Sequence, residues 1–316
     1  MGKLKSPTFL IILAFFSIYV IWGSTYLLNK IAVTELPPFM LASIRFTTAG
    51  ILIFIIAKFM GIKLSITRKQ FINSIIAGFL FLSFGNGIIV WALKYVDSGF
   101  AALESAAQPL VVLLLMRILE GRKIKTMSVV GVVLGMIGMF LLVSQKQVIN
   151  QEGTILGMSM IFVSIISWVY GSLFVAKADL SPNFFVNTGY QMITGGFTLL
   201  LASLLFAEKW TAPTDWSQPV QLSMILLIIF GSIVAFTAFN YLLRTVSPEK
   251  VATSTYVNPI IAMILGWYFL EEQITLQSVM AASVLLTGVY FINTKKKLVL
   301  YSRFSKRIKA YKETRV

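Results

Sequence analysis

Long apolar runs separated by short polar segments dominate the hydrophobic pattern of this 316-residue chain. Each run has about the length, roughly 20 residues, that an α-helix needs to cross the hydrocarbon core of a bilayer. The segments between the runs are too short to form a soluble domain, so the pattern predicts an all-α membrane protein. The ten predicted spans are residues 9–29, 39–60, 71–93, 98–119, 126–144, 155–176, 184–206, 221–243, 250–270 and 275–293.

The composition supports a membrane protein and excludes several kinds of chemistry. Hydrophobic residues make up 57% and charged residues 12% of the chain, and the mean hydropathy is +0.84. The chain has no cysteine and no histidine, which excludes disulfides, thiolate nucleophiles and the commonest metal ligand. No P-loop motif is present and no paired carboxylates lie within the spans, so we expect no cofactor, no ATP-driven step within this chain and no intramembrane enzyme.

The net charge of +15 is distributed unevenly along the chain. Most of the 27 Lys and Arg residues fall on the N-terminal side of the first span and on every second loop, whereas only Lys30, Lys94, Lys146 and Lys209 fall on the alternate loops. The positive-inside rule then predicts that both termini lie in the cytoplasm. We expect a multi-pass protein of the plasma membrane, which is the inner membrane in a bacterium. The basic segment 295–316 is interpreted as a cytoplasmic tail that faces the lipid surface, and no nucleic acid partner is expected.

Two carboxamide–proline pairs indicate that one structural unit occurs twice. Gln108-Pro109 and Asn258-Pro259 stand 150 residues apart, each near the middle of a predicted span. The chain therefore divides into a first repeat, residues 1–144, and a second repeat, residues 153–294, with five spans each. Because five is odd, the second repeat must cross the membrane in the opposite sense to the first. Inverted repeats with matching helix interruptions are typical of alternating-access carriers.

At this point the motifs resemble a known family. The chain resembles EamA-type members of the drug/metabolite transporter superfamily in motifs of three spans. These are Trp22-Gly23-Ser24 with Asn29-Lys30 in the first span, Pro37-Pro38 and Arg45-Phe46 around the second, and Asn258-Pro259 followed by Gly266 and Glu271 in the ninth. The resemblance covers nearly the whole chain. It implies a ten-helix carrier whose central cavity is lined by the first, third, fourth, sixth, eighth and ninth spans, with the fifth and tenth at the periphery.

Two ionisable residues lie inside predicted spans, where each charge costs at least about 2.5–3.5 kcal/mol on insertion scales. Arg45 and Glu104 are each six residues into a span from the same side, so an ion pair between them is one hypothesis. The second hypothesis is that Glu104 responds to protons or cations. The third is that these residues contact a charged or zwitterionic substrate.

The carboxamides Gln108 and Asn258 are candidates for substrate binding. Proline removes the backbone bond to the carbonyl four residues earlier, which is that of Ser105 or Thr255. The amides and the freed carbonyls then offer uncharged polar groups near mid-membrane. The alternative is that Pro109 and Pro259 only kink their helices and that each amide satisfies the freed backbone.

A glycine pair in the third span predicts a second point of flexure. Gly85 and Gly87 flank Asn86, and such a stretch suits a hinge. Asn86 either faces the cavity or bonds between helices. Aromatic and hydroxyl side chains within the predicted spans complete the list of candidate substrate contacts, with helix packing as the alternative: Trp22, Ser24, Trp91, Trp168, Tyr170, Tyr241 and Tyr256.

Glycines 131, 135 and 138 in the fifth span include a G-x-x-x-G motif. The motif indicates either a dimer face or close packing within the monomer, and we favour the packing. The expected oligomeric state is therefore a monomer or a homodimer. The function predicted for the whole chain is export of a small metabolite, amino acid or amphipathic toxic compound, the direction being implied by the resemblance. Uptake or movement of a lipid-like substrate on the same fold, and a channel, are the alternatives.

Overall fold

All the regular elements of the structure, a computed structural model, are helices within the residues it describes, which are 7–121, 126–144, 152–252 and 254–293. The first half contains α1 (Pro7–Val33), α2 (Pro38–Phe59), α3 (Arg68–Gly78), η1 (Phe79–Gly87), α4 (Ile88–Ala92), α5 (Ser98–Ser105), α6 (Gln108–Glu120) and α7 (Thr126–Val143). The second half contains α9 (Thr154–Val175), α10 (Phe184–Leu205), η2 (Pro213–Asp215), α11 (Gln218–Leu226), η3 (Leu227–Val234), α12 (Ala235–Thr245), α13 (Pro248–Val251), α14 (Ser254–Leu270) and α15 (Leu276–Asn293). The basic tail 295–316 and Arg122 lie outside the described residues.

The predicted all-α membrane fold is confirmed. Each apolar run of the sequence coincides with a helical stretch in the described part of the chain. Six of these stretches are long and apolar enough to cross a membrane, and three shorter apolar helices lie within α7, α14 and α15. Two repeats of this helical architecture therefore account for nearly the whole chain.

Local sequence signals set several helix ends. Pro38 begins α2, where its missing N–H would be unpaired in any case. Thr67 and Gln70 form a capping box at the start of α3, in which Gln70 N donates to the Thr67 hydroxyl at 3.2 Å and Thr67 N donates to the Gln70 side chain at 3.1 Å. Gly121 ends α6 in the left-handed region, at φ 65°.

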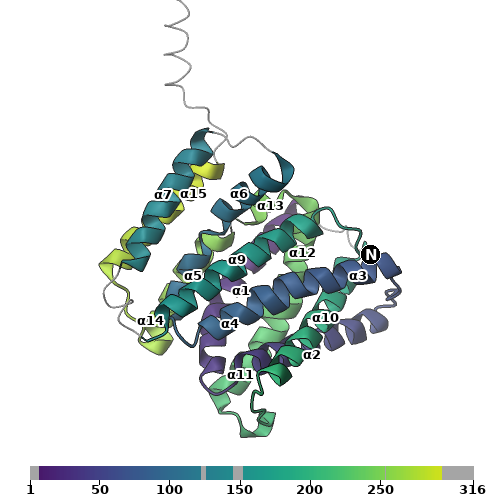
Figure 1. Ribbon diagram of the computed structural model, residues 1–316. Coiled ribbons are helices and arrows are strands. Elements are labelled where there is room, and N and C mark those ends of the chain that lie inside the picture. The colour runs from purple at the N-terminus through teal and green to yellow at the C-terminus, as the bar shows by residue number, and fades with distance from the viewer. Residues whose placement is uncertain (1–6, 122–125, 145–151, 253, 294–316) are drawn as a thin grey trace, which may run out of the picture.

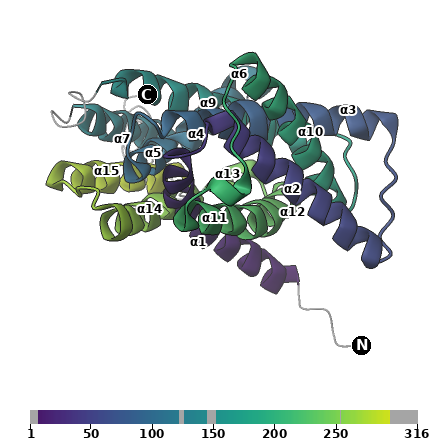
Figure 2. The same cartoon turned by 90° about the horizontal axis from the view of Figure 1, so that it is seen from below.

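Helices at corresponding places in the two halves pack against each other. Figures 1 and 2 show α2 beside α10, and α7 beside α15 at one end of the molecule. The central helix α1 contacts α12 and α14 of the second half. The halves therefore share one interior and do not form separate domains.

The small residues of α7 are used in packing within the chain. A Cβ on Gly138 would lie 2.7 Å from Leu285 on α15, and a Cβ on Gly288 would lie 2.7 Å from the main-chain oxygen of Gly131. Such close approach of two helices needs glycine on both sides. The glycines of the G-x-x-x-G motif thus let α7 pack closely on α15.

Three of the long helical stretches are interrupted. The third and the eighth each contain a π-helical segment, η1 and η3, flanked by α-helix on both sides. The fourth is broken at Ala106 and Ala107, where α5 ends and α6 begins. π-Helical turns are rare and occur mostly at functional sites.

Candidate functional site

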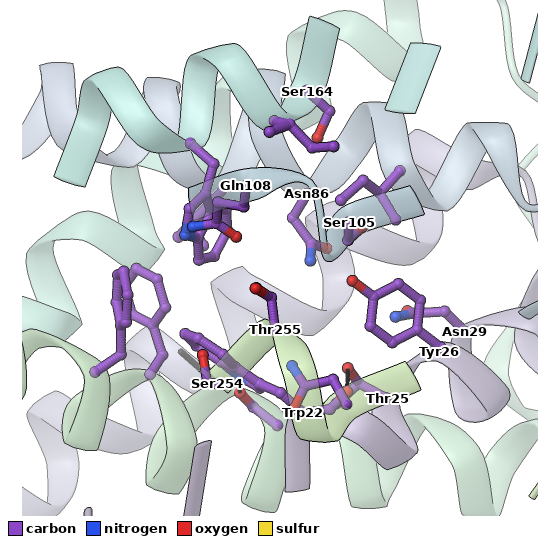
Figure 3. Close-up of a pocket in the computed structure, with 18 of the residues that line it drawn as sticks. Trp22, Thr25, Tyr26, Asn29, Asn86, Ser105, Gln108, Ser164, Ser254 and Thr255 are labelled. Carbon is purple, nitrogen blue, oxygen red and sulfur yellow. Dashed lines mark hydrogen bonds between the residues drawn. The ribbon is translucent and has the colours of Figure 1, made fainter. Parts of the chain in front are cut away.

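A cavity lies where the helices of the two halves meet (Figure 3). The centre of a water molecule can reach a volume of about 80 Å³ inside it. Since one water needs about 10–15 Å³ of such space, the cavity has room for about five to eight waters. At about 30 Å³ of liquid volume each, this corresponds to roughly 150–240 Å³.

The cavity lining comes from every predicted cavity span and from two more. Arg45 and Phe46 of α2 and Met192 of α10 add to the first, third, fourth, sixth, eighth and ninth stretches, whereas no described residue of α7 or α15 contributes. The polar lining residues are Thr25, Tyr26, Asn29, Arg45, Asn86, Ser105, Gln108, Ser164, Ser254, Thr255 and Asn258. Both halves therefore supply polar groups to the same cavity.

Each π-helical segment is held by the opening helix of the other half. Ser164 of α9 donates to the main-chain oxygen of Gly85 at 2.6 Å, and Ser167 donates to that of Leu80 at 2.8 Å. In the opposite direction, Trp22 Nε1 of α1 donates to the main-chain oxygen of Gly231 in η3 at 3.2 Å. These side chains satisfy carbonyls that the widened helical turns leave exposed.

An aromatic cluster forms one wall of the cavity. Trp22 and Trp168 meet edge to face with centroids 5.6 Å apart, and Phe239 lies 4.9 Å from Trp22 and 5.4 Å from Trp168. Phe81 and Phe236 extend the cluster. Trp22 and Trp168 thus combine the two roles considered from the sequence, since they pack together and line the cavity.

Arg45 is a buried guanidinium at the cavity edge, with 2% of its surface exposed. Its Nε donates to the Ser232 hydroxyl of η3 at 2.8 Å and its Nη1 donates to Asn29 Oδ1 at 3.3 Å. The guanidinium carbon also lies 4.8 Å from the centre of the Phe46 ring. None of these partners carries a negative charge.

The hypothesis of an Arg45–Glu104 ion pair is wrong. Both residues are described and buried, but no oxygen of Glu104 lies within salt-bridge distance of Arg45. Arg45 directs its nitrogens toward η3 and α1 instead. Glu104 is not a cavity-lining residue, and its Oε2 is buried without a hydrogen-bond partner. Equal depth along two helices did not imply that the side chains point toward each other.

The two carboxamides have diverged in use. The Asn258 amide, assigned with its nitrogen toward three acceptors, donates to the main-chain oxygens of Tyr19 at 2.9 Å, Ser254 at 3.0 Å and Ile18 at 3.2 Å. It therefore ties α14 to α1. Gln108 lines the cavity, and its amide makes no protein hydrogen bond within the described residues. Gln108 is the member of the pair that is open to a ligand (Figure 3).

The two prolines also occupy different settings. Pro259 lies inside α14, whereas Pro109 lies in the first turn of α6, just after the break at Ala106 and Ala107. Proline in a first turn loses no helical bond. The interruption of the fourth span therefore precedes Pro109 by one turn of backbone.

The glycine pair of η1 is tightly packed. A Cβ on Gly85 would lie 3.1 Å from the Trp168 ring, and one on Gly87 would lie 2.6 Å from Leu199. Asn86 between them lines the cavity, and its Oδ1 is buried without a partner. This polar atom needs a ligand or water to be satisfied.

Four further candidate residues, Ser24, Trp91, Tyr170 and Tyr241, do not line the cavity. Ser24 donates to the Ile21 carbonyl of its own helix at 2.7 Å, and Trp91 packs against Phe39 and Phe206. Tyr170 is 46% exposed on the outer surface, and Tyr241 packs on Phe184 beside a separate apolar groove. The side chain of Tyr256 lies outside the described part of the chain.

One end of the bundle is closed by contacts that join the two halves. The Glu272 carboxylate, just after α14, accepts from Ser98 N at 3.0 Å, Ser98 Oγ at 2.8 Å and Gly99 N at 3.2 Å. It thereby caps the N-terminus of α5 in place of Asp97, whose own side chain makes no capping bond. Glu271 adopts φ 56°, a left-handed turn that directs Glu272 toward α5.

Two further charges lie at this closed end. Lys30 Nζ donates to the main-chain oxygens of Leu93 and Val96, each at 2.8 Å, at the C-terminal end of α4. Burial raises the pKa of the Asp97 carboxyl, the Glu272 charge raises it further, and the Lys30 charge lowers it. We name Glu272, Ser98, Lys30 and Asp97 the end network.

Sequence reasoning missed several cavity residues that carried a signal. Tyr26 and Asn29 follow the predicted Trp22 at helical spacing and so share a face with it. Phe236 and Phe239 show the same spacing on α12. Ser232, Ser164 and Glu272 carried no comparable signal, because their partners lie on helices far away in sequence.

An apolar helical bundle with one polar cavity between two repeated halves defines the class, a multi-pass membrane transporter. The chain belongs to the EamA-like transporter family, whose pattern matches residues 9–144 and 155–294. The resemblance noted from the motifs is therefore confirmed.

The names of similar proteins agree with this class. The chain is 35% identical over 286 residues to the "Uncharacterized inner membrane transporter YedA" of Escherichia coli K12, which covers 90% of this chain and 91% of YedA. It is 22% identical to the "Uncharacterized transporter YoaV" of Bacillus subtilis, over 90% of this chain and 96% of YoaV. A solved structure titled "Crystal structure of protein" matches the fold with a TM-score of 0.66 at 18% identity, over 89% of this chain and 95% of that one.

Proposed function

We propose that this protein is a secondary active carrier that exports a small metabolite across the inner membrane by alternating access. The observation that carries the proposal is a polar cavity to which both repeats contribute. Tyr26 and Gln108 come from the first half, and Trp168 and Thr255 from the second. A site at the interface of two repeats can open to either side when one repeat rocks against the other.

Inverted repeats support this cycle. With five spans in each half, the second half runs opposite to the first, and α2 with α10 and α7 with α15 are corresponding helices that meet. The distribution of Lys and Arg supports an orientation with both termini in the cytoplasm. The end network then lies on the outer face, so this conformation is closed toward the outside. The name of the relative YedA supports the inner membrane as the location.

Opening requires the end network to separate and the helices to bend. The π-helical segments η1 and η3 and the break at Ala106 and Ala107 interrupt the helices next to the cavity. We assign flexure to these points, with Gly85, Gly87, Pro109 and Pro259 as the residues that permit it. The substrate would contact Trp22, Asn86, Gln108 and Trp168.

The cavity volume favours a small metabolite over a drug-sized compound. Sites for drug-sized ligands measure about 300–1,000 Å³, more than the roughly 150–240 Å³ estimated above. A lipid-like substrate would need a larger or laterally open site. Export, as opposed to uptake, follows from the family resemblance.

Glu104 is the residue through which a proton gradient would act. The chain has no histidine, and Glu104 is the buried carboxyl with an unsatisfied oxygen one turn from Gln108. Its charge state therefore bears directly on the stability of this conformation.

Counterflow in proteoliposomes tests the carrier proposal. Vesicles preloaded with a pool of unlabelled small metabolites should accumulate a labelled member of the pool faster than unloaded vesicles, because a carrier exchanges substrate across one site. Ser105→Trp should block this exchange by filling the cavity, and Ser159→Trp on the exposed face of α9 should not. Flux without stimulation by internal substrate would indicate a channel and refute the proposal.

A further inference from the structure

Arg45 holds a positive charge inside the bundle without a counter-charge. Its side chain is 2% exposed, and its hydrogen-bond partners, Ser232 and Asn29, are neutral. No hydrogen bond of Nη2 to a protein acceptor is found within the described residues. Leaving a buried charge unpaired is strongly unfavourable, so a counter-ion is expected to bind at least part of the time.

The cavity is the place from which a counter-ion can reach Arg45. The guanidinium belongs to the cavity lining, and none of the lining residues is a carboxylate. Glu104 of the fourth span is outside the lining, and within the described residues it forms no salt bridge with Arg45. A negative charge at this guanidinium must therefore come from the ligand.

The other residues of the cavity lining indicate the chemistry of the uncharged part of the ligand. Trp22, Trp168 and Phe239 form an aromatic wall on which an apolar ring can pack. Gln108 and the unsatisfied Oδ1 of Asn86 offer neutral hydrogen bonds. We propose that the substrate is a small organic monoanion, an aromatic or aliphatic carboxylate, whose carboxylate binds Arg45.

This inference rests on the proposed carrier function and adds a driving force to it. Planar guanidinium groups bind carboxylates through two parallel hydrogen bonds, and Nη2 is free to start one. In a cell whose interior is electrically negative, the exit of a monoanion is favoured by the membrane potential alone. Export would then need no coupled ion.

Three probes of nearly equal shape test the charge of the ligand. Binding of 3-phenylpropionate (an anion), 3-phenylpropionamide (neutral) and 3-phenylpropylamine (a cation) to the full-length protein in detergent is measured by calorimetry and thermal shift. We expect the anion to bind most tightly. Binding of the amide or the amine that equals or exceeds that of the carboxylate would overturn the inference, as would no binding of the carboxylate. The comparison uses the wild-type protein, so it does not depend on the folding of a variant.

Variants then test the residue. Arg45→Gln should weaken 3-phenylpropionate binding by about 30-fold or more, because a buried charge loses its partner. Arg45→Lys should retain part of the affinity, since the charge remains. Lys58→Gln, at the exposed end of the same helix, is the matched control and should bind normally. Unchanged carboxylate binding by Arg45→Gln would overturn the assignment.

Transport separates this inference from the proposed function. Proteoliposomes loaded with labelled 3-phenylpropionate should release it faster when a potassium diffusion potential makes the interior negative. Counterflow of the amide or the amine without the carboxylate would leave the carrier proposal intact and refute the anion. Absence of counterflow for the probes and for the metabolite pool alike would refute the carrier itself.

Discussion

The contact between Glu272 and α5 predicts how easily one end of the bundle opens. Its carboxylate accepts three hydrogen bonds from Ser98 and Gly99, and these bonds join the second half to the first. They can exist only while this end is closed. In Glu272→Gln the remaining side-chain oxygen can keep the Ser98 contacts, whereas the charge and one acceptor are lost.

The size of the effect follows from the geometry. A hydrogen bond to a charged group contributes about 1.5–3 kcal/mol. Loss of one such bond raises the population open at this end by about 10- to 100-fold, since each 1.4 kcal/mol corresponds to tenfold.

The absence of cysteine makes the assay direct. Ser105→Cys places one thiol in the cavity, at a position where the native hydroxyl donates to the Ala101 carbonyl of its own helix. The rate of its reaction with a membrane-impermeant maleimide, added from the Glu272 side, reports the open population. Glu272→Gln should increase this rate by about 10- to 100-fold.

The matched control is Glu271→Gln, which removes the same charge from the exposed neighbouring residue. It should leave the labelling rate unchanged. Equal rates in the Glu272 and Glu271 variants would refute the closing role of Glu272. An equal increase from both sides of the membrane would mean that the substitution loosens the whole bundle.

Three further predictions concern the end network, coupling and packing. Asp97→Asn removes a carboxylate whose charge is disfavoured by burial and by repulsion from Glu272, so it should raise the melting temperature at pH 7. The native pKa of Asp97 lies above its ordinary value of 3.8, so wild-type stability falls as pH rises from the ordinary to the native pKa, and the variant should lack this component in melts compared between pH 4 and 7. Glu104→Gln should abolish any dependence of transport on a pH gradient and should leave the response of transport to the membrane potential unchanged. Transport that still follows the pH gradient would exclude Glu104 as the coupling group. Gly288→Val should lower the free energy of unfolding by about 1–3 kcal/mol, since its Cβ meets the Gly131 carbonyl, and Ser283→Val on the exposed face of the same helix should have little effect in the same melts.

The helical architecture could be read from the sequence because one strong physical constraint governs it. A chain in hydrocarbon must satisfy its backbone internally, so each apolar run of sufficient length becomes a helix. The pairing of Gln108-Pro109 with Asn258-Pro259 likewise located corresponding helices. Trp22 and Trp168 were placed at mid-membrane by counting residues, and both line the cavity.

What the sequence could not provide was the direction of side chains around each helix. Arg45 and Glu104 lie at similar depth, but the guanidinium turns toward Ser232, a residue 187 positions away in the chain. Gln108 and Asn258 look equivalent in sequence, but only Asn258 has carbonyls of α1 within reach. Contacts between distant helices decide both cases, and a single sequence contains no record of them.

The π-helical segments were missed for the same reason. Gly85 and Gly87 indicated a soft stretch, but a widened turn is stable only when an outside group takes its exposed carbonyl. Ser164 and Ser167 do this for η1, and Trp22 does it for η3. Neither serine stands near its partner in the chain.

This reciprocal bonding has a consequence for biosynthesis. Each half contains a helix whose main chain is incompletely satisfied until the opening helix of the other half arrives. Ser164 and Ser167 are made long after η1 has left the ribosome, so the third span must wait in the membrane for the sixth. During that interval it can adopt an ordinary α-helical turn, and the π geometry forms only when the second half docks. Co-expression of the two halves as separate chains should therefore yield an assembled protein, whereas either half alone should remain a target for membrane proteolysis.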